Sequence, residues 1–249
     1  MAEAVRALTL AELRKRKSVK WRHFPSDVLP LPVAEMDFPT APKIKAALTD
    51  MVERSDTGYL GPFPELFDAF ANFSAKRWGW QVDTKQMRIA TDVGVGIVEI
   101  MRTLIKPGEK VMLNSPVYEN IWRWVSEVHA TTVDTPLSEE NLSYKLDLTA
   151  IEKEYQNGVK VHILCNPHNP VGAVFSKNQL SELADLAKKY QVVILSDEIH
   201  APLTYDAKTF TPFLNVSQTA REVGITITSA SKSFNLAGLK CAVIISDST

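Results

Sequence analysis

The hydrophobic and polar positions of the chain alternate between two periods over most of its length. Apolar residues recur every three or four positions in six segments, which predicts helices over residues 43–52, 66–78, 96–105, 119–128, 148–155 and 176–190. Short apolar runs predict seven strands, over residues 88–91, 110–114, 131–134, 159–165, 192–196, 225–228 and 241–245. Strands that alternate with helices form a largely parallel sheet. We therefore expect an α/β fold in which a mostly parallel, seven-stranded sheet is sandwiched by helices.

The N-terminal part of the chain does not follow this alternation. Thr9 and Glu12 have the spacing of a capping box, which predicts a short basic helix over residues 10–17. Its basic cluster, residues 14–17, fits either a nucleic-acid patch or a solvated helix face, and the solvated face is the commoner arrangement. Five prolines between positions 25 and 42 exclude a continuous helix. This stretch is therefore expected to be an extended arm that lies along another part of the protein.

Composition and charge narrow the class of protein. The 249 residues are 45% hydrophobic, and 28 basic against 29 acidic residues leave a formal charge of −1. No global field would therefore draw the chain to nucleic acid or to anionic lipid. There are two cysteines, and no apolar stretch has the length of a signal-peptide core or a membrane span. We expect a soluble, cytoplasmic protein with neither a nucleic-acid nor a membrane partner.

Residues suited to catalysis follow four of the predicted strands, at the ends where parallel sheets bind their ligands. A glycine turn over residues 91–96 precedes a helix and suits the binding of a phosphate by backbone amides. Two Asn-Pro steps present Asn169 in an extended turn. Asp197 stands at the end of an apolar strand, where a carboxylate needs a cation, and Lys232 follows a strand, where a lysine can become a nucleophile.

Each of these patterns also has a structural explanation. Many glycine turns bind nothing, and Asn169 can serve only its own turn. Asp197 can cap a helix or form a structural ion pair. Lys232 can be a solvated surface charge, as most lysines are. The order and spacing of the patterns favour a site, because 28 positions separate Asn169 from Asp197 and 35 separate Asp197 from Lys232.

This series resembles a fold-type I pyridoxal-phosphate enzyme. Four motifs narrow the resemblance: AEMDF at 34–38, CNPHNPVG at 165–172, SDEIH at 196–200 and SASKSFNLAGLK at 229–240. They are similar to the bacterial carbon–sulfur lyases, the cystathionine β-lyase group of the MalY/PatB type in the class I/II aminotransferase superfamily. The resemblance runs from about residue 21 to the end of the chain. It implies that residues 1–45 form an N-terminal segment and arm belonging to a small domain, and that residues 46–249 form the large cofactor-binding domain.

The resemblance assigns the cofactor, pyridoxal 5′-phosphate, to particular residues, and it implies no metal ion. Asp197 would keep the ring nitrogen protonated, so that the ring acts as an electron sink. Lys232 would hold the aldehyde covalently and later act as general base at the substrate α-carbon. Gly94, Val95, Ser229 and Lys240 would bind the phosphate. Many aminotransferases carry an arginine at the last of these positions, and a lysine keeps the charge without the bidentate fork.

Four further residues are implied to surround the cofactor. Asn169 would donate to its phenolic oxygen, and Tyr118 would stack on its ring, although Tyr118 would otherwise be a core tyrosine. His200 stands where many aminotransferases carry a tyrosine, which favours the lyase branch. Tyr59 would reach the phosphate of a neighbouring subunit, which implies a homodimer. The arm over residues 31–38 would line the substrate entrance.

The implied reaction is β-elimination from cystathionine or a related cysteine S-conjugate, giving a thiol, pyruvate and ammonia. An aminotransferase is the alternative, because it needs the same cofactor machinery. A regulatory or scaffold protein that retains the fold is a third possibility. Only 17 residues follow Lys232, so we expect the chain to be truncated before a C-terminal small domain. The arginine that binds the substrate carboxylate in this superfamily would then lie beyond Thr249.

Overall fold

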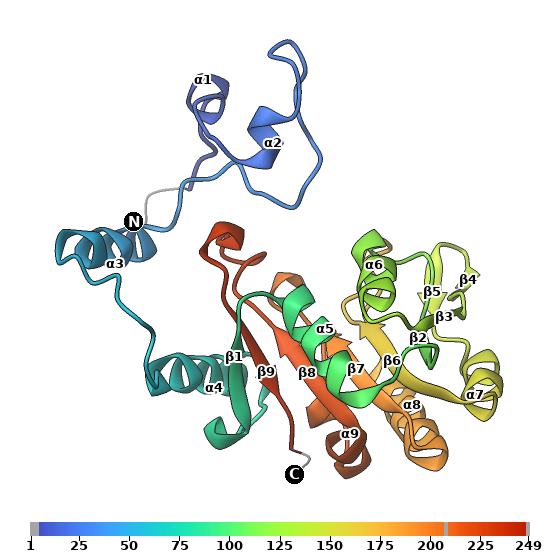
Figure 1. Cartoon of the computed structure of the whole chain (residues 1–249). Coiled ribbons are helices and arrows are strands. Elements are labelled where there is room, and N and C mark those ends of the chain that lie inside the picture. The colour runs from blue at the N-terminus through green and yellow to red at the C-terminus, as the bar shows by residue number, and fades with distance from the viewer. Residues whose placement is uncertain (1–4, 207–208, 248–249) are drawn as a thin grey trace.

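A seven-stranded sheet forms the centre of the protein, as the computed structural model in Figure 1 shows for residues 5–206 and 209–247. Its strands follow the order β1 (Met87–Ala90), β9 (Ala242–Ile245), β8 (Gly224–Thr228), β7 (Val193–Asp197), β6 (Val159–Cys165), β2 (Lys110–Leu113) and β3 (Thr131–Asp134). All seven coincide with predicted strands to within one residue or two at each end. The predicted α/β fold with a mostly parallel sheet is therefore confirmed.

Strand direction decides which residues meet at one edge of the sheet. The pairs from β8 through β7, β6 and β2 to β3 are parallel. Strand β9 is antiparallel to both of its neighbours, β1 and β8. Since β1 is antiparallel to β9, it runs in the same direction as the parallel strands. The residues just before β9 consequently lie at the same edge as the carboxyl ends of the other strands.

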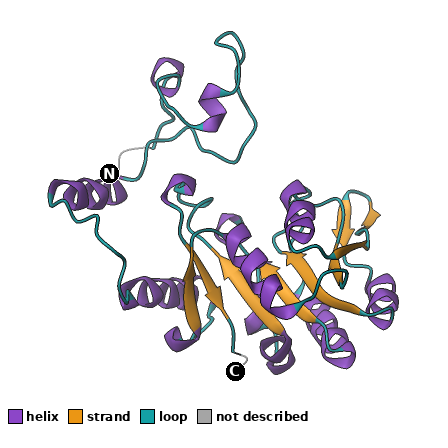
Figure 2. Ribbon diagram, viewed as in Figure 1, coloured by secondary structure: helices purple, strands orange, loops and turns teal. Residues whose placement is uncertain are grey.

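Helices cover both faces of the sheet (Figure 2). Helices α5 (Val93–Leu104) and α6 (Glu119–Glu127) pack on one face through a core that contains Ile97, Met101 and Ile121. The other face is covered by α4 (Pro64–Trp78), α7 (Leu148–Gln156), α8 (Lys177–Tyr190) and α9 (Gln218–Val223). Strand β6 lies between the two layers and is buried except at Lys160, as expected of a central parallel strand.

The structure corrects three details of the expected elements. The helix expected over residues 10–17 is instead α1 (Leu10–Leu13), with both halves of its capping box formed, followed by α2 (Val19–Arg22). Helix α5 begins at Val93 rather than at residue 96, because the Asp92 side chain caps it. The hairpin of β4 (Ser138–Glu140) and β5 (Ser143–Lys145) was not predicted, since most of its residues are exposed and carry no apolar alternation.

Short 3-10 turns complete the described elements: η1 (Thr84–Gln86), η2 (Ala201–Leu203), η4 (Phe213–Asn215) and η5 (Ala237–Leu239).

The N-terminal segment stands apart from the sheet in Figure 1. Helix α3 (Pro42–Glu53) has no buried residue, and an extended proline-rich arm precedes it. The arm is held to the sheet domain at Met36, whose backbone N–H donates to Asn235 Oδ1 at 3.0 Å. Asn235 Nδ2 donates back to the Met36 carbonyl at 3.2 Å. Across the described ranges, none of the helices has the length and apolar character needed to cross a membrane.

Candidate active site

A cavity of about 1000 Å³ lies at the edge of the sheet where the parallel strands end. Eight of the ten residues expected at the site line it: Gly94, Val95, Tyr118, Asn169, Asp197, His200, Lys232 and Lys240. They come from five separate stretches of the chain, which the topology brings to one edge. Val33 and Ala34 of the arm also line the cavity, close to where the sequence places the entrance.

Asp197 is the last residue of β7, and only 4% of it is exposed. Its Oδ1 accepts a hydrogen bond from Ile199 N at 3.1 Å, and no other hydrogen bond reaches the carboxyl group from the described residues. Burial raises the pKa of Asp197 to about 6, while the Ile199 N–H and the charge of Lys232 act in the opposite direction. The carboxylate thus has a single hydrogen-bond donor among the described residues, and a cation in the cavity would stabilise it.

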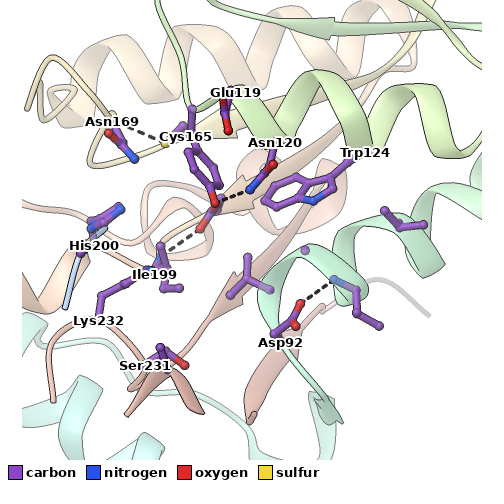
Figure 3. Close-up of a pocket in the computed structure, with 18 of the residues that line it drawn as sticks. Asp92, Glu119, Asn120, Trp124, Cys165, Asn169, Ile199, His200, Ser231 and Lys232 are labelled. Carbon is purple, nitrogen blue, oxygen red and sulfur yellow. Dashed lines mark hydrogen bonds between the residues drawn. The ribbon is translucent and has the colours of Figure 1, made fainter. Parts of the chain in front are cut away.

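Lys232 lies in the turn after β8, and Figure 3 shows its side chain beside His200 and Ile199. Burial lowers the pKa of His200, and the positive charge of Lys232 lowers it further. His200 is therefore neutral near pH 7. A neutral imidazole next to an amine can accept or donate a hydrogen bond without adding charge to the cavity.

The N-terminus of α5 forms a second polar end of the cavity. Asp92 Oδ1 accepts a hydrogen bond from Val95 N at 2.8 Å, and Lys240 Nζ lies 3.0 Å from Asp92 Oδ2. Gly94 lies beneath the indole of Trp124, where an added Cβ would come within 2.7 Å of the ring. The helix dipole at the N-terminus of α5 and the lysine together suit the binding of an anion, and both face the Asp92 carboxylate.

Tyr118 and Asn169 approach the cavity from different loops. Tyr118 N donates to the Asn169 carbonyl at 3.0 Å, so the two loops are joined through their backbones. The Tyr118 ring packs edge-on against Trp124 at a centroid distance of 6.0 Å, and its hydroxyl contacts Asn120. Asn169 N donates to Cys165 Sγ at 3.4 Å. Burial raises the pKa of the Cys165 thiol, so the sulfur stays protonated.

Comparison with known proteins gives the family. The sequence model of the protein family "Aminotransferase class I and II" matches residues 26–249. The chain belongs to this family. It is 40% identical over 237 residues to the cystathionine β-lyase of Corynebacterium glutamicum, a match that covers 94% of this chain and 62% of the relative. It is 31% identical over 235 residues to the cystathionine β-lyase PatB of Bacillus subtilis, covering 92% and 61%.

Solved structures agree with this class I and II assignment. The crystal structure of cystalysin from Treponema denticola, which contains a pyridoxal 5′-phosphate cofactor, matches with a TM-score of 0.90 at 26% identity. The match covers 100% of this chain and 64% of that one. The chain thus spans less than two thirds of the length of these relatives.

Two of the expected residues do not line the cavity of this aminotransferase-family chain. The hydroxyl of Ser229 is held by its neighbours: Oγ lies 2.6 Å from the Cys241 carbonyl and 2.8 Å from Ser231 Oγ, and it accepts from Ser231 N at 3.0 Å. Ser231 lines the cavity instead. Tyr59 is fully exposed between α3 and α4, and the single chain does not bring it to the cavity.

Asp92 and Trp124 are site residues that the sequence did not single out. Asp92 lies within the glycine turn, and an aspartate directly before a helix is a typical N-cap, so the sequence did carry a signal for its capping role. Trp124 carried no such signal, because it lies on the regular helix α6 and meets Gly94 only through the tertiary fold. No group of three or more His, Cys, Asp or Glu residues within the described ranges is arranged to hold a metal ion.

Proposed function

We propose that this protein is a pyridoxal 5′-phosphate-dependent carbon–sulfur β-lyase. The observation that carries the proposal is that Asp197, a buried carboxyl group with one hydrogen bond from the described residues, and Lys232 line the same cavity. The lyase relatives and the cofactor in cystalysin support it. The substrate would be cystathionine or a related cysteine S-conjugate. Elimination breaks its Cβ–S bond, and water releases the product as pyruvate and ammonia beside the free thiol.

The residues of the cavity fit the cofactor. The unsatisfied carboxyl of Asp197 suits a protonated ring nitrogen, since a cation there offsets the cost of burying the charge. At the other end, the amides of α5 and the Lys240 ammonium suit a phosphate. Tyr118 and Asn169 would contact the ring and its phenolic oxygen.

The side chains of this protein then have distinct tasks in the reaction. When bound, pyridoxal phosphate supplies the electron sink for the negative charge that develops at the substrate α-carbon. The Lys232 amine would bind the cofactor covalently, be released by the substrate amine, and take the proton from the α-carbon. Asp197 would stay ionised and would hold the proton on the ring nitrogen. His200, neutral beside Lys232, would orient that amine without raising the charge of the cavity.

An aminotransferase is the second candidate, because the matching family is described as that of class I and II aminotransferases. The two reactions share the removal of the α-proton by Lys232 and differ in the step that follows. A lyase expels the sulfur, whereas an aminotransferase returns the proton to the cofactor and needs a keto acid to complete its cycle.

We also propose a homodimer, in which Tyr59 reaches the phosphate site of the partner subunit. Tyr59 is exposed, and large apolar side chains are exposed throughout the arm, helix α3 and the segment after it. These residues are Val28, Leu29, Leu31, Val33, Phe38, Leu48, Met51, Val52, Leu60 and Phe63. Such a stretch costs free energy in water unless another surface covers it. The division into an N-terminal segment of residues 1–45 and a cofactor-binding domain of residues 46–249 belongs to the same proposal.

Two experiments test the function. The purified chain is mixed with pyridoxal phosphate, and a visible absorption band that borohydride abolishes and that Lys232→Ala lacks would support covalent binding. Lys188→Ala serves as a control, because Lys188 is an exposed lysine of α8 that does not line the cavity. Pyruvate release from cystathionine is then measured with and without a keto acid. Release without the keto acid supports the lyase, whereas strict dependence on it would leave the aminotransferase.

A further inference from the structure

His168 lies between the two Asn-Pro steps, and only 2% of it is exposed. Each of its ring nitrogens faces a backbone carbonyl at 3.0 Å. Nδ1 faces Cys165, at the end of β6, and Nε2 faces Pro116, in the loop after β2. His168 itself belongs to the loop after β6, so its Nε2 contact with the Pro116 carbonyl is the one that joins the two loops. A neutral ring with its proton on Nε2 donates to that oxygen.

These two loops are the ones that carry Tyr118 and Asn169 to the cavity. Pro116 stands two residues before Tyr118, and Cys165 stands four before Asn169. The loops meet again where Tyr118 N donates to the Asn169 carbonyl at 3.0 Å. His168 does not itself line the cavity. Any effect on a bound ligand must therefore pass through its two neighbours.

We propose that His168 is a positioning residue, which fixes Tyr118 and Asn169 relative to each other by bridging their loops. The inference rests on the proposed function, because the ligand that Tyr118 and Asn169 would contact is the pyridoxal ring. Phe175 packs edge-on against the imidazole at 5.7 Å and restricts its rotation. Burial lowers the pKa of His168, while backbone hydrogen bonds at Pro116, Cys165 and Asn114 oppose this shift.

His162 provides a matched control. It is also a buried histidine of β6 with a partner at each ring nitrogen, the Tyr155 hydroxyl and Asn114 Oδ1, both at 2.7 Å. It does not line the cavity, and among the described residues it meets the loop after β2 only at Asn114, the first residue of that loop. Asn114 is also held by its own Nδ2, which donates to the Thr135 carbonyl at 2.9 Å. A substitution there removes comparable buried hydrogen bonds. It should lower stability without changing the affinity of the folded chain for the cofactor.

The test measures the dissociation constant of pyridoxal phosphate by absorbance, and the circular dichroism band of the bound cofactor. We expect His168→Gln to raise the dissociation constant at least tenfold and to weaken the band, and His162→Gln to change neither. In a Tyr118→Ala background, His168→Gln should raise the dissociation constant by a smaller factor than in the wild type, because one of the two residues it positions is already gone.

Every outcome decides between the alternatives. Unchanged binding by His168→Gln, or effects that add fully to those of Tyr118→Ala, would overturn the positioning role while leaving the proposed function intact. If His168→Gln and His168→Asn both fail to fold while His162→Gln folds, His168 is a structural core residue and the inference is wrong. A wild-type chain that binds no pyridoxal phosphate overturns the proposed function, and this inference with it.

Discussion

Asp197→Asn is expected to stabilise the cofactor-free chain while abolishing cofactor binding. Burial raises the pKa of Asp197 from its ordinary value of 3.8 to about 6. The folded chain thus holds the proton more tightly than the unfolded chain. The stability linked to this group is fully present below about pH 4 and is lost as the pH rises through about 6.

The magnitude follows from that difference. A pKa difference of one corresponds to about 1.36 kcal/mol. The rise in the pKa of Asp197 from 3.8 to about 6 therefore corresponds to about 3 kcal/mol of stability lost by pH 8. Asparagine carries no charge and avoids this loss. The variant should therefore exceed the wild type by up to about 3 kcal/mol at pH 8, and the difference should shrink toward zero at pH 4.

Urea unfolding followed by tryptophan fluorescence, at pH 4, 6 and 8, measures this difference. Asp147→Asn is the control, because Asp147 caps α7 by accepting from Ala150 N at 3.0 Å, and asparagine caps a helix equally well. A variant of Asp197 that is less stable than the wild type at pH 8 would refute the reasoning. It would mean that the carboxylate already has a sufficient cation in Lys232. Absorbance titration with pyridoxal phosphate should show affinity reduced at least tenfold.

Three further substitutions test other parts of the cavity and its support. Burial raises the pKa of Glu198 to about 8, so the wild type loses stability as the pH rises toward 8. Glu198→Gln should remove part of the resulting fall in melting temperature between pH 5 and pH 8, and a pH profile equal to that of the wild type would contradict this. Gly94→Ala places a Cβ 2.7 Å from the Trp124 ring and should cost about 1–3 kcal/mol in urea unfolding, which Trp124→Leu in the same chain should largely restore. Lys240→Met breaks an exposed ion pair with Asp92 and should change stability by less than about 1 kcal/mol. In binding titrations, Lys240→Met should lower the affinity for pyridoxal phosphate but not the affinity for pyridoxal. An equal loss of affinity for both ligands would exclude a contact of Lys240 with the phosphate.

The sequence alone was sufficient for the fold class and for much of the site. Its strands could be located because burial on both faces of a central strand leaves an uninterrupted apolar run, as in β6. Once the strands are known, their carboxyl ends follow, and Asn169, Asp197 and Lys232 stand at those ends. Local chemistry was also readable where it involved neighbours in the chain, as in the capping box of Thr9 and Glu12.

Only the tertiary structure decided which distant residues meet. Lys240 reaches the cavity because β9 is antiparallel to its neighbours, a direction that the residues of β9 do not encode locally. The hydroxyl of Ser229 turns to Cys241, and Trp124 covers Gly94, through packing between elements far apart in the chain. Hydrophobic periodicity indicates whether a position is buried. It does not indicate which side chain of another element packs against that position, because this depends on the order and direction of the strands in the sheet.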